Sequence, residues 1–299
     1  MDFLLQQLLN ALAFGAEYAL VALGLAMVFS IMGLVNFAHG QIIGVAAYTV
    51  FLSAALGLTS PVVAIVIAIV IAAGSAVLLE RVAFRPVRFS PTTTGLLTAF
   101  GVSLVVQNMF QLFVSARPQS VSILNDLNQM WFIGSFAVSS LQVLELIVAL
   151  VAMILLVLCL NKTTIGLAIR AASRDFTTVR LMGIRANRVV ASAFAISGAL
   201  AGIAAVFIVA RRGSVTPDLG FALVLKAFVA CVIGGFGSLA GAAVGGLLLG
   251  FIEVAMLVIL PDRYGDFKDA LTFAIVVAIL IYRPEGLFGK RVELGDKEI

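Results

Sequence analysis

The only histidine of the chain, His39, lies in a short polar stretch between two long apolar runs. The stretch reads Val-Asn-Phe-Ala-His-Gly-Gln over residues 35–41. Histidine ordinarily changes charge near neutral pH, so His39 is the first candidate for chemistry. No second ligand stands at metal-binding spacing and no nucleophile accompanies it, so neither a metal site nor a catalytic base is indicated. The alternatives for His39 are contact with a transport pathway and a structural hydrogen bond that pins a helix.

Such a break inside an apolar run predicts an interrupted helix. Backbone groups freed by a break are tolerated in a membrane only against protein or a water-filled path. A second break, Gly-Gly-Phe-Gly-Ser, follows at residues 234–238, and the order of apolar run, break and apolar run over residues 20–56 recurs within residues 221–260. Two interrupted helices at corresponding places in two halves of a chain point to a transport site.

Three charged residues fall within apolar segments: Glu17, Lys226 and Glu253. Charges inside a membrane are costly, and they are usually paired or face a pathway. A hairpin about residues 234–238 would carry Lys226 and Glu253 toward the outer half, with straight helices leaving them about 10 Å apart in depth at about 1.5 Å per residue. Lys226 and Glu253 are therefore a candidate ion pair that fixes helix register or contacts substrate. Glu17 has no evident partner in the sequence, and we expect it near the outer interface.

The composition indicates the elements that must position these residues. Of the 299 residues 62% are hydrophobic and 11% are charged, and the mean hydropathy is +1.17. Soluble domains carry about 25% charged residues, so this chain is predicted to be an integral membrane protein. Its apolar runs are continuous, which favours an all-α class over a β-barrel. At about 20 residues per span, we expect eight to nine transmembrane segments in a single transmembrane domain, residues 1–299.

The basic residues predict the orientation of the chain. Thirteen of the nineteen Lys and Arg fall in three clusters, at residues 81–88, 162–188 and 283–297. The positive-inside rule places these clusters in the cytoplasm, with the N-terminus outside and the C-terminus inside. Nine apolar segments alternate consistently with this orientation. We read them at residues 4–34, 41–57, 61–79, 95–114, 141–160, 189–210, 221–235, 239–260 and 268–282.

The polar segment at residues 161–188 is predicted to be cytoplasmic. We expect one short helix there, from about Ile165 to Met182, that ends at Gly183, a common helix stop. Charges that only set orientation do not explain an ordered helix between two spans, whereas docking of a cytoplasmic partner would. The span that follows, residues 189–210, carries small residues, among them Gly198 and Gly202, that suit close helix packing.

Other functions lack their motifs. The two cysteines, Cys159 and Cys231, lie in apolar runs and are interpreted as small core residues. No phosphate-binding loop of the GxxxxGK[ST] type is present, so an ATPase, if one is needed, must be another polypeptide. No catalytic set indicates an enzyme. The net charge of +4 follows topology and does not indicate nucleic acid.

Five motifs in the same order resemble the inner-membrane permease subunits of branched-chain amino acid ABC transporters, nearly end to end. They are VNFAHG at 35–40, ERVAFRPVR at 80–88, GLAIRAASRD with LMGI at 166–175 and 181–184, LKAFVACVIGGFGSLAGAAVGGLLLGFIE at 225–253, and YRPEGLFG at 282–289. The chain is similar to the shorter of the two permease types, which begins directly with the helix before the first motif.

The resemblance implies the partners and the candidate site residues. It implies a second, homologous permease subunit, two cytoplasmic ATPase subunits, a periplasmic substrate-binding protein, and a bacterial inner membrane. ATP and Mg²⁺ belong to the ATPase chains, and no cofactor or metal is expected in this one. The implied substrate-pathway residues, with Gln41 added from the first break, are Asn36, Phe37, Ala38, His39, Gly40, Gln41, Gly234, Gly235, Gly237 and Ser238. The implied ATPase-coupling residues are Gly166, Arg170, Ala171, Asp175, Gly183 and Ile184.

Departures from the family pattern leave alternatives open. Many such permeases carry Glu where this chain has Gln41, and small residues near Val179 and Arg180. The leading hypothesis is an ATP-driven importer of branched-chain or similar amino acids that works by alternating access. The same architecture importing urea, short amides or another small polar solute is the first alternative. A secondary transporter or channel that works without an ATPase is a more distant one.

Overall fold

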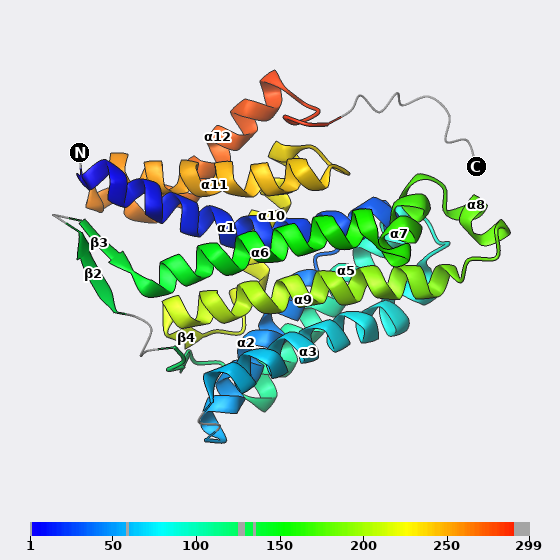
Figure 1. Cartoon of the computed structure of the whole chain (residues 1–299), viewed down its shortest axis with the longest axis horizontal. Helices are drawn as coiled ribbons and strands as arrows, with labels where there is room; N and C mark the ends of the chain where they lie inside the picture. The colour runs from blue at the N-terminus through cyan, green and yellow to red at the C-terminus, as the bar shows by residue number, and fades with distance from the viewer. Residues whose placement is uncertain (1, 58–59, 125–128, 134–135, 290–299) are drawn as a thin grey trace.

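The computed structural model describes residues 2–57, 60–124, 129–133 and 136–289, and most of them are helical (Figure 1). The helices are α1 (Asp2–Met32), α2 (His39–Ala55), α3 (Pro61–Leu79), α4 (Arg85–Val87), α5 (Thr92–Phe113), α6 (Ser140–Lys162), α7 (Thr164–Arg174), α8 (Phe176–Leu181), α9 (Ala186–Arg212), α10 (Leu219–Gly234), α11 (Leu239–Ile259) and α12 (Lys268–Tyr282). A π-helix at Glu80–Phe84 joins α3 to α4, and a 3₁₀-helix at Asp262–Phe267 precedes α12.

The all-α membrane class is confirmed by the lengths and composition of the helices. Among the described residues, six helical stretches are long and apolar enough to cross a membrane: 3–32, 61–87, 92–113, 140–162, 186–212 and 239–259. Two shorter apolar helices, α2 and α10, flank the predicted breaks. The predicted eight to nine spans count these two and α12 in addition, and the number of full crossings stays a prediction.

The core of the molecule is built around α1. This helix packs against α9, α10 and α11 and is buried along most of its length, whereas α3, α5 and α6 expose apolar side chains along theirs. Glycines allow the close approach: a Cβ at Gly250 of α11 would overlap the backbone of Gly15 of α1. The small residues predicted to mediate packing do so in α9, where Gly198 lies against Ala72 and Ala76 of α3.

Four short strands among the described residues were not predicted. β2 (Met130–Ile133) and β3 (Phe136–Ser139) pair antiparallel, with Met130 opposite Ser139, and β1 (Gln119–Ser120) pairs antiparallel with β4 (Ser214–Val215). Figure 1 shows the β2–β3 hairpin at one end of the bundle and α7 and α8 at the other. The long helices therefore lie between one end formed by strands and another formed by short helices.

The single helix predicted from about Ile165 to Met182 is wrong. The structure has two helices, α7 and α8, with Asp175 between them in an extended conformation, φ −150° and ψ 101°. Gly183 has a φ of +77°, in the left-handed region that favours glycine, and it follows α8 as a helix stop does. The predicted stop is thus correct, and the continuous helix before it is not.

Candidate functional site

The first break lies between α1 and α2. Gly33, with φ +67°, ends α1, and the chain turns through residues 34–38 before α2 begins at His39. Three backbone N–H groups, of His39, Gly40 and Gln41, donate to the carbonyls of Asn36, Phe37 and Ala38. The interruption predicted for residues 35–41 therefore falls on residues 33–38, and residues 39–41 form the first turn of α2.

His39 is fully buried between α1, α2 and α9. Its Nδ1 lies 3.3 Å from Ser197 Oγ of α9, and Ser197 Oγ donates to the Gly24 carbonyl of α1 at 2.8 Å. A Cβ at Gly24 would lie 2.9 Å from His39 Nε2, so the imidazole occupies the space that this glycine leaves. His39, on α2, therefore connects this helix to α1 and α9.

Gly40 and Gln41 hold the start of α2 against its neighbours. A Cβ at Gly40 would overlap the Gly220 carbonyl at the start of α10, so the two helices touch through backbone. Gln41 Nε2 donates to Ser103 Oγ of α5 at 3.0 Å, while Gln41 Oε1 is buried without a hydrogen-bond partner among the described residues.

Asn36 and Phe37 have groups that could contact a solute. Asn36 is 1% exposed, and neither atom of its amide has a hydrogen-bond partner within the described residues. The Phe37 ring is half-buried and lies 5.8 Å from the ring of Phe228 and 6.5 Å from that of Phe100. An uncommitted amide and, next to it in the sequence, an aromatic ring together offer a donor, an acceptor and an apolar surface.

The second break is linked to the first by aromatic contact. The Phe228 ring lies 5.5 Å from that of Phe236, which occupies the turn between α10 and α11. Gly235 and Gly237 supply the positive φ angles of that turn, 96° and 83°, and Ser238 Oγ accepts from Gly241 N at the start of α11. The structure thus brings the phenylalanines of the two breaks into one run.

The backbone at the end of α10 is covered by the last described residues. The N–H of Leu287 donates to the Ile233 carbonyl at 2.8 Å, and that of Phe288 donates to the Gly234 carbonyl at 3.0 Å. The carbonyl groups that the break frees are therefore satisfied within the protein. Gly235 lies against this segment, at Phe288 and Gly289, whereas Gly234 faces Gly241 at the start of α11.

The Lys226 and Glu253 side chains meet. Lys226 Nζ lies 2.8 Å from Glu253 Oε1, which also lies 2.9 Å from Lys268 Nζ. Tyr18 OH of α1 donates to Glu253 Oε2 at 2.6 Å, and Asp269 lies 3.3 Å from Lys226. The long lysine side chain and the close packing of α10 on α11 span the depth difference expected for straight helices.

Glu17, for which the sequence shows no evident partner, has one in the structure. Glu17 is 2% exposed and forms an ion pair with Arg211 at the end of α9, whose guanidinium also lies 4.1 Å from the Phe14 ring centroid. Glu145 of α6 lies beside this pair and is 1% exposed. Sequence reasoning missed Arg211 and Glu145 because both are far from Glu17 along the chain.

The residues predicted to couple to an ATPase divide between two faces of α8. Arg170, Ala171 and Asp175 line a groove of about 610 Å³ that Val179 and Met182 complete. Gly183 and Ile184 instead line a second cavity, described below. Gly166 contacts neither, because it is buried against the backbone of residues 159–160 at the end of α6.

The groove is built by local capping and an exposed apolar edge. Thr163 Oγ1 accepts from Gly166 N at 3.0 Å and so caps α7, and Arg170 donates to Asn161 Oδ1 at 2.7 Å. Leu181 and Met182 are 83% and 73% exposed. Large exposed apolar side chains beside charges in a polar segment are typical of a surface that docks another protein.

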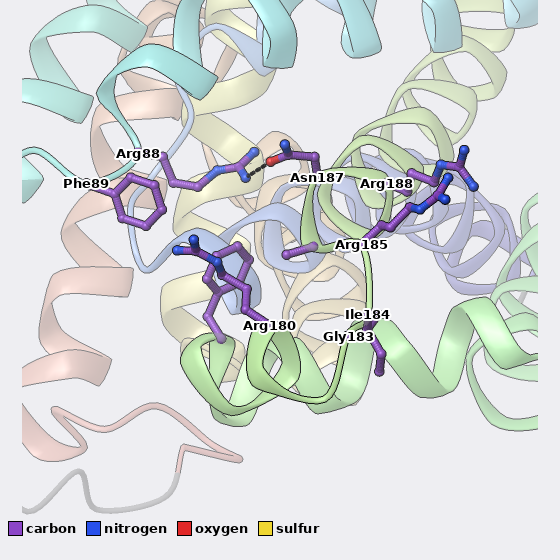
Figure 2. A pocket seen from close by; sticks show the side chains of 10 residues that line it. Arg88, Phe89, Arg180, Gly183, Ile184, Arg185, Asn187 and Arg188 are labelled. Atoms are coloured by element: carbon purple, nitrogen blue, oxygen red, sulfur yellow. Dashed lines mark hydrogen bonds between the residues drawn. The ribbon is translucent and has the colours of Figure 1, made fainter.

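Residues 80–88, noted in the sequence for their resemblance and for their basic residues, form an ion cluster. Glu80 is fully buried and pairs with Arg85 at 3.0 Å and with Arg88. Arg88 also donates to Asn187 Oδ1 at 2.8 Å and lies 5.6 Å from the Phe176 ring centroid. Arg88 therefore connects the end of α4 to α8 and to the start of α9 (Figure 2).

No group of three or more His, Cys, Asp or Glu that could hold a metal ion occurs within the described part of the chain. The candidate site consists of two helix breaks, the aromatic rings that link them, and a groove beside α7 and α8.

Comparison with known proteins gives an end-to-end match. The family model described as "Branched-chain amino acid transport system / permease component" matches residues 7–280. The high-affinity branched-chain amino acid transport system permease proteins BraD of Pseudomonas aeruginosa and LivH of Escherichia coli K12 are each 35% identical to this chain over 96% of both sequences. The ribose import permease protein RbsC of Haemophilus influenzae is 26% identical over 93% of this chain and 85% of its own. No solved structure matches.

Proposed function

Because the chain belongs to the family of branched-chain amino acid transport permeases, we propose that it is the membrane-spanning subunit of an ATP-driven importer for branched-chain or similar amino acids. The match over residues 7–280, with 35% identity to permeases named for these substrates, carries the proposal. It is a multi-pass transport subunit and not an enzyme, and the ATPase and binding-protein partners follow from the family.

The face that joins the two breaks is the proposed substrate pathway. A zwitterionic amino acid needs donors for its carboxylate, acceptors for its ammonium group and an apolar wall for its side chain. Asn36 offers an amide that has no partner among the described residues, and Phe37 and Phe228 offer the wall. His39 and Gly40 hold the break in shape from behind, through α9 and α10.

The groove between α7 and α8 is the proposed docking surface for the ATPase. Its position at one end of the bundle, its arginines and its exposed apolar edge support this role. In the proposed mechanism, closure of the ATPase dimer moves α7 and α8, and α9, which follows them directly, carries the movement to His39 through Ser197. The membrane half then alternates between outward and inward access.

The proposed assembly contains a second, homologous permease subunit, two ATPase subunits and a periplasmic binding protein. The basic groups around α7 and α8 support a cytoplasmic location for that end, with the N-terminus outside and the chain in a bacterial inner membrane. The nucleotide and Mg²⁺ are placed in the ATPase chains, because this sequence carries no phosphate-binding loop.

The test is leucine uptake into proteoliposomes of controlled orientation. They hold this chain with its partner permease and ATPases, plus binding protein, with and without lumenal ATP. We expect leucine uptake only when both ATP and binding protein are present. ATP-dependent uptake of urea or an amide instead would keep the architecture and change the cargo, which the neutral Gln41 would suit. Uptake by this chain alone, driven by an ion gradient, would overturn the proposal.

The coupling role has its own variant. Arg170→Glu with Asp175→Lys reverses two charges in the groove. We expect the chain to reach the membrane but to lose ATP-driven uptake and ATPase binding. Arg81→Glu is the matched control, since Arg81 is exposed at the same end and does not line the groove. Unchanged uptake and ATPase binding in the double variant would remove the groove from the mechanism.

A further inference from the structure

A second cavity, of about 540 Å³, borders α8 next to the docking groove, and Figure 2 shows the side chains that line it. Four arginines line it: Arg88 at the end of α4, Arg180 on α8, and Arg185 and Arg188 at the start of α9. Phe89 forms a further part of the wall, and the Arg180 guanidinium lies 5.5 Å from its ring centroid. Two stretches distant in sequence, residues 88–89 and 176–188, thus contribute arginines to the lining of one cavity.

The positive charge of this cavity is not balanced by its own walls. None of the described residues that line it is acidic. Glu80, just outside the lining, pairs with Arg88 but also with Arg85, so one carboxylate serves two guanidinium groups. Burial lowers the pKa of Arg88 from its ordinary value, Glu80 opposes the shift, and the charges of Arg85 and Arg180 add to it. An anion in the cavity would relieve this repulsion.

The cavity lies at the level where two membrane spans end. The stretch 61–87 ends directly before Arg88, and the stretch 186–212 begins directly after Arg185. The two stretches pack against each other, since Gly202 of α9 lies against Ile69 and Ala72 of α3. Phe89 is 76% exposed beside them. The boundary between hydrocarbon and water is the depth at which lipid headgroups are found.

We propose that this cavity binds the phosphate-bearing headgroup of an anionic phospholipid in the leaflet on the α8 side. Guanidinium groups bind phosphate oxygens in pairs of parallel hydrogen bonds, and basic pockets between membrane helices suit such headgroups. The first turn of α9 carries no acidic residue, and its N-terminal dipole adds to the attraction for an anion.

The position of α8 favours a lipid over the ATPase as the occupant. The groove proposed for the ATPase is lined by Asp175, Val179 and Met182, whereas the cavity is lined by Phe176, Arg180 and Ile184. One face of α8 is therefore available to a protein while the other borders the ends of two spans. The proposal goes beyond the import function and does not depend on the cargo.

The test measures lipid retention by the full-length chain in detergent, using native mass spectrometry during titration with phosphatidylglycerol or with phosphatidylcholine. We expect a preference for phosphatidylglycerol that Arg180→Gln with Arg188→Gln weakens. At about fivefold per arginine near a charged surface, the double variant should lose affinity by about 25-fold. Arg81→Gln with Lys162→Gln removes the same charge at exposed positions outside the cavity and should retain the lipid.

A second pair of variants guards against misfolding. Arg180→Lys and Arg188→Lys keep the charge and lose the paired hydrogen bonds, and each should give an intermediate loss with an unchanged elution profile. Equal retention of both lipids, or equal losses in the cavity and control variants, would overturn the proposal. So would displacement of phosphatidylglycerol by inorganic phosphate at equal concentration, which would assign the cavity to a free anion. Loss of ATPase binding with lipid retention unchanged would assign it to the protein partner.

Discussion

Arg211→Met should destabilise the protein much more than Lys226→Met, although both remove a cation from a buried carboxylate. Arg211 is the only cation within ion-pair distance of Glu17 among the residues that the structure describes. Its removal leaves Glu17 buried beside a second carboxyl group, Glu145, and also ends the contact with the Phe14 ring. Breaking a buried pair from one side costs about 3–5 kcal/mol, and the lost ring contact adds about 0.5–1 kcal/mol.

After Lys226→Met the Glu253 carboxylate still has two partners. Glu253 keeps Lys268 Nζ at 2.9 Å and the Tyr18 hydroxyl at 2.6 Å. The loss is therefore close to that of one hydrogen bond to a charged group, about 1.5–3 kcal/mol. The structure thus predicts an order, with the Arg211 variant less stable than the Lys226 variant by roughly 2 kcal/mol.

Thermal unfolding of the purified chain in detergent, followed by the loss of the monodisperse elution peak, measures this order. At about 2–4 °C per kcal/mol, the Arg211 variant should unfold at least about 4 °C below the Lys226 variant. Adding Glu17→Gln to Arg211→Met should restore part of the loss, because the uncompensated charge is removed. Equal stabilities, or a Lys226 variant that is the weaker of the two, would refute the reasoning from partner number.

Three further predictions concern the first break. Asn36→Leu should leave thermal stability unchanged or raised, because a buried amide with no partner in the described chain is replaced by an apolar group, yet leucine uptake should fall at least tenfold; uptake at the normal rate would exclude Asn36 from the pathway. Phe37→Ala should raise the KM for leucine more than that for alanine, since the larger side chain loses more wall, and equal changes in a competition assay would contradict this. Gly40→Ala should lower the unfolding temperature, because the added methyl group separates α2 from Gly220. In Gly74→Ala the added methyl group meets nothing within 4 Å, so this variant should unfold at a slightly higher temperature, since alanine favours the helix over glycine by about 1 kcal/mol.

Sequence reasoning succeeded where one local signal sufficed. Continuous apolar runs gave the membrane class, glycine and polar residues gave the two breaks, and Gly183 gave the end of α8. Local signals failed at Asp175, where the chain becomes extended between two helices although the flanking residues are compatible with one. They failed also at the β2–β3 hairpin, whose residues are as apolar as those of the spans.

Contacts between distant segments were the least predictable part of the site. Counting residues from the turn at 234–238 was enough to propose that Lys226 pairs with Glu253, because both lie in the two helices that this turn joins. No such arithmetic links Glu17 to Arg211, which are 194 residues apart, or Arg88 to Phe176 and Asn187. These pairings depend on how α1, α4, α8 and α9 pack in three dimensions, and a single sequence carries no direct record of that.

The distance along the chain between Glu17 and Arg211 has a consequence for synthesis. The first helix leaves the ribosome with its carboxylate long before the arginine that neutralises it, and the glycines of α11 that α1 packs against emerge later still. During synthesis α1 therefore carries an unpaired carboxyl group, and it lacks its α11 contacts until nearly the whole chain has been made. A chain that terminates before α9 would leave the Glu17 carboxylate without Arg211 inside the hydrocarbon region. We expect such a fragment to be unstable and to be degraded by membrane quality-control proteases.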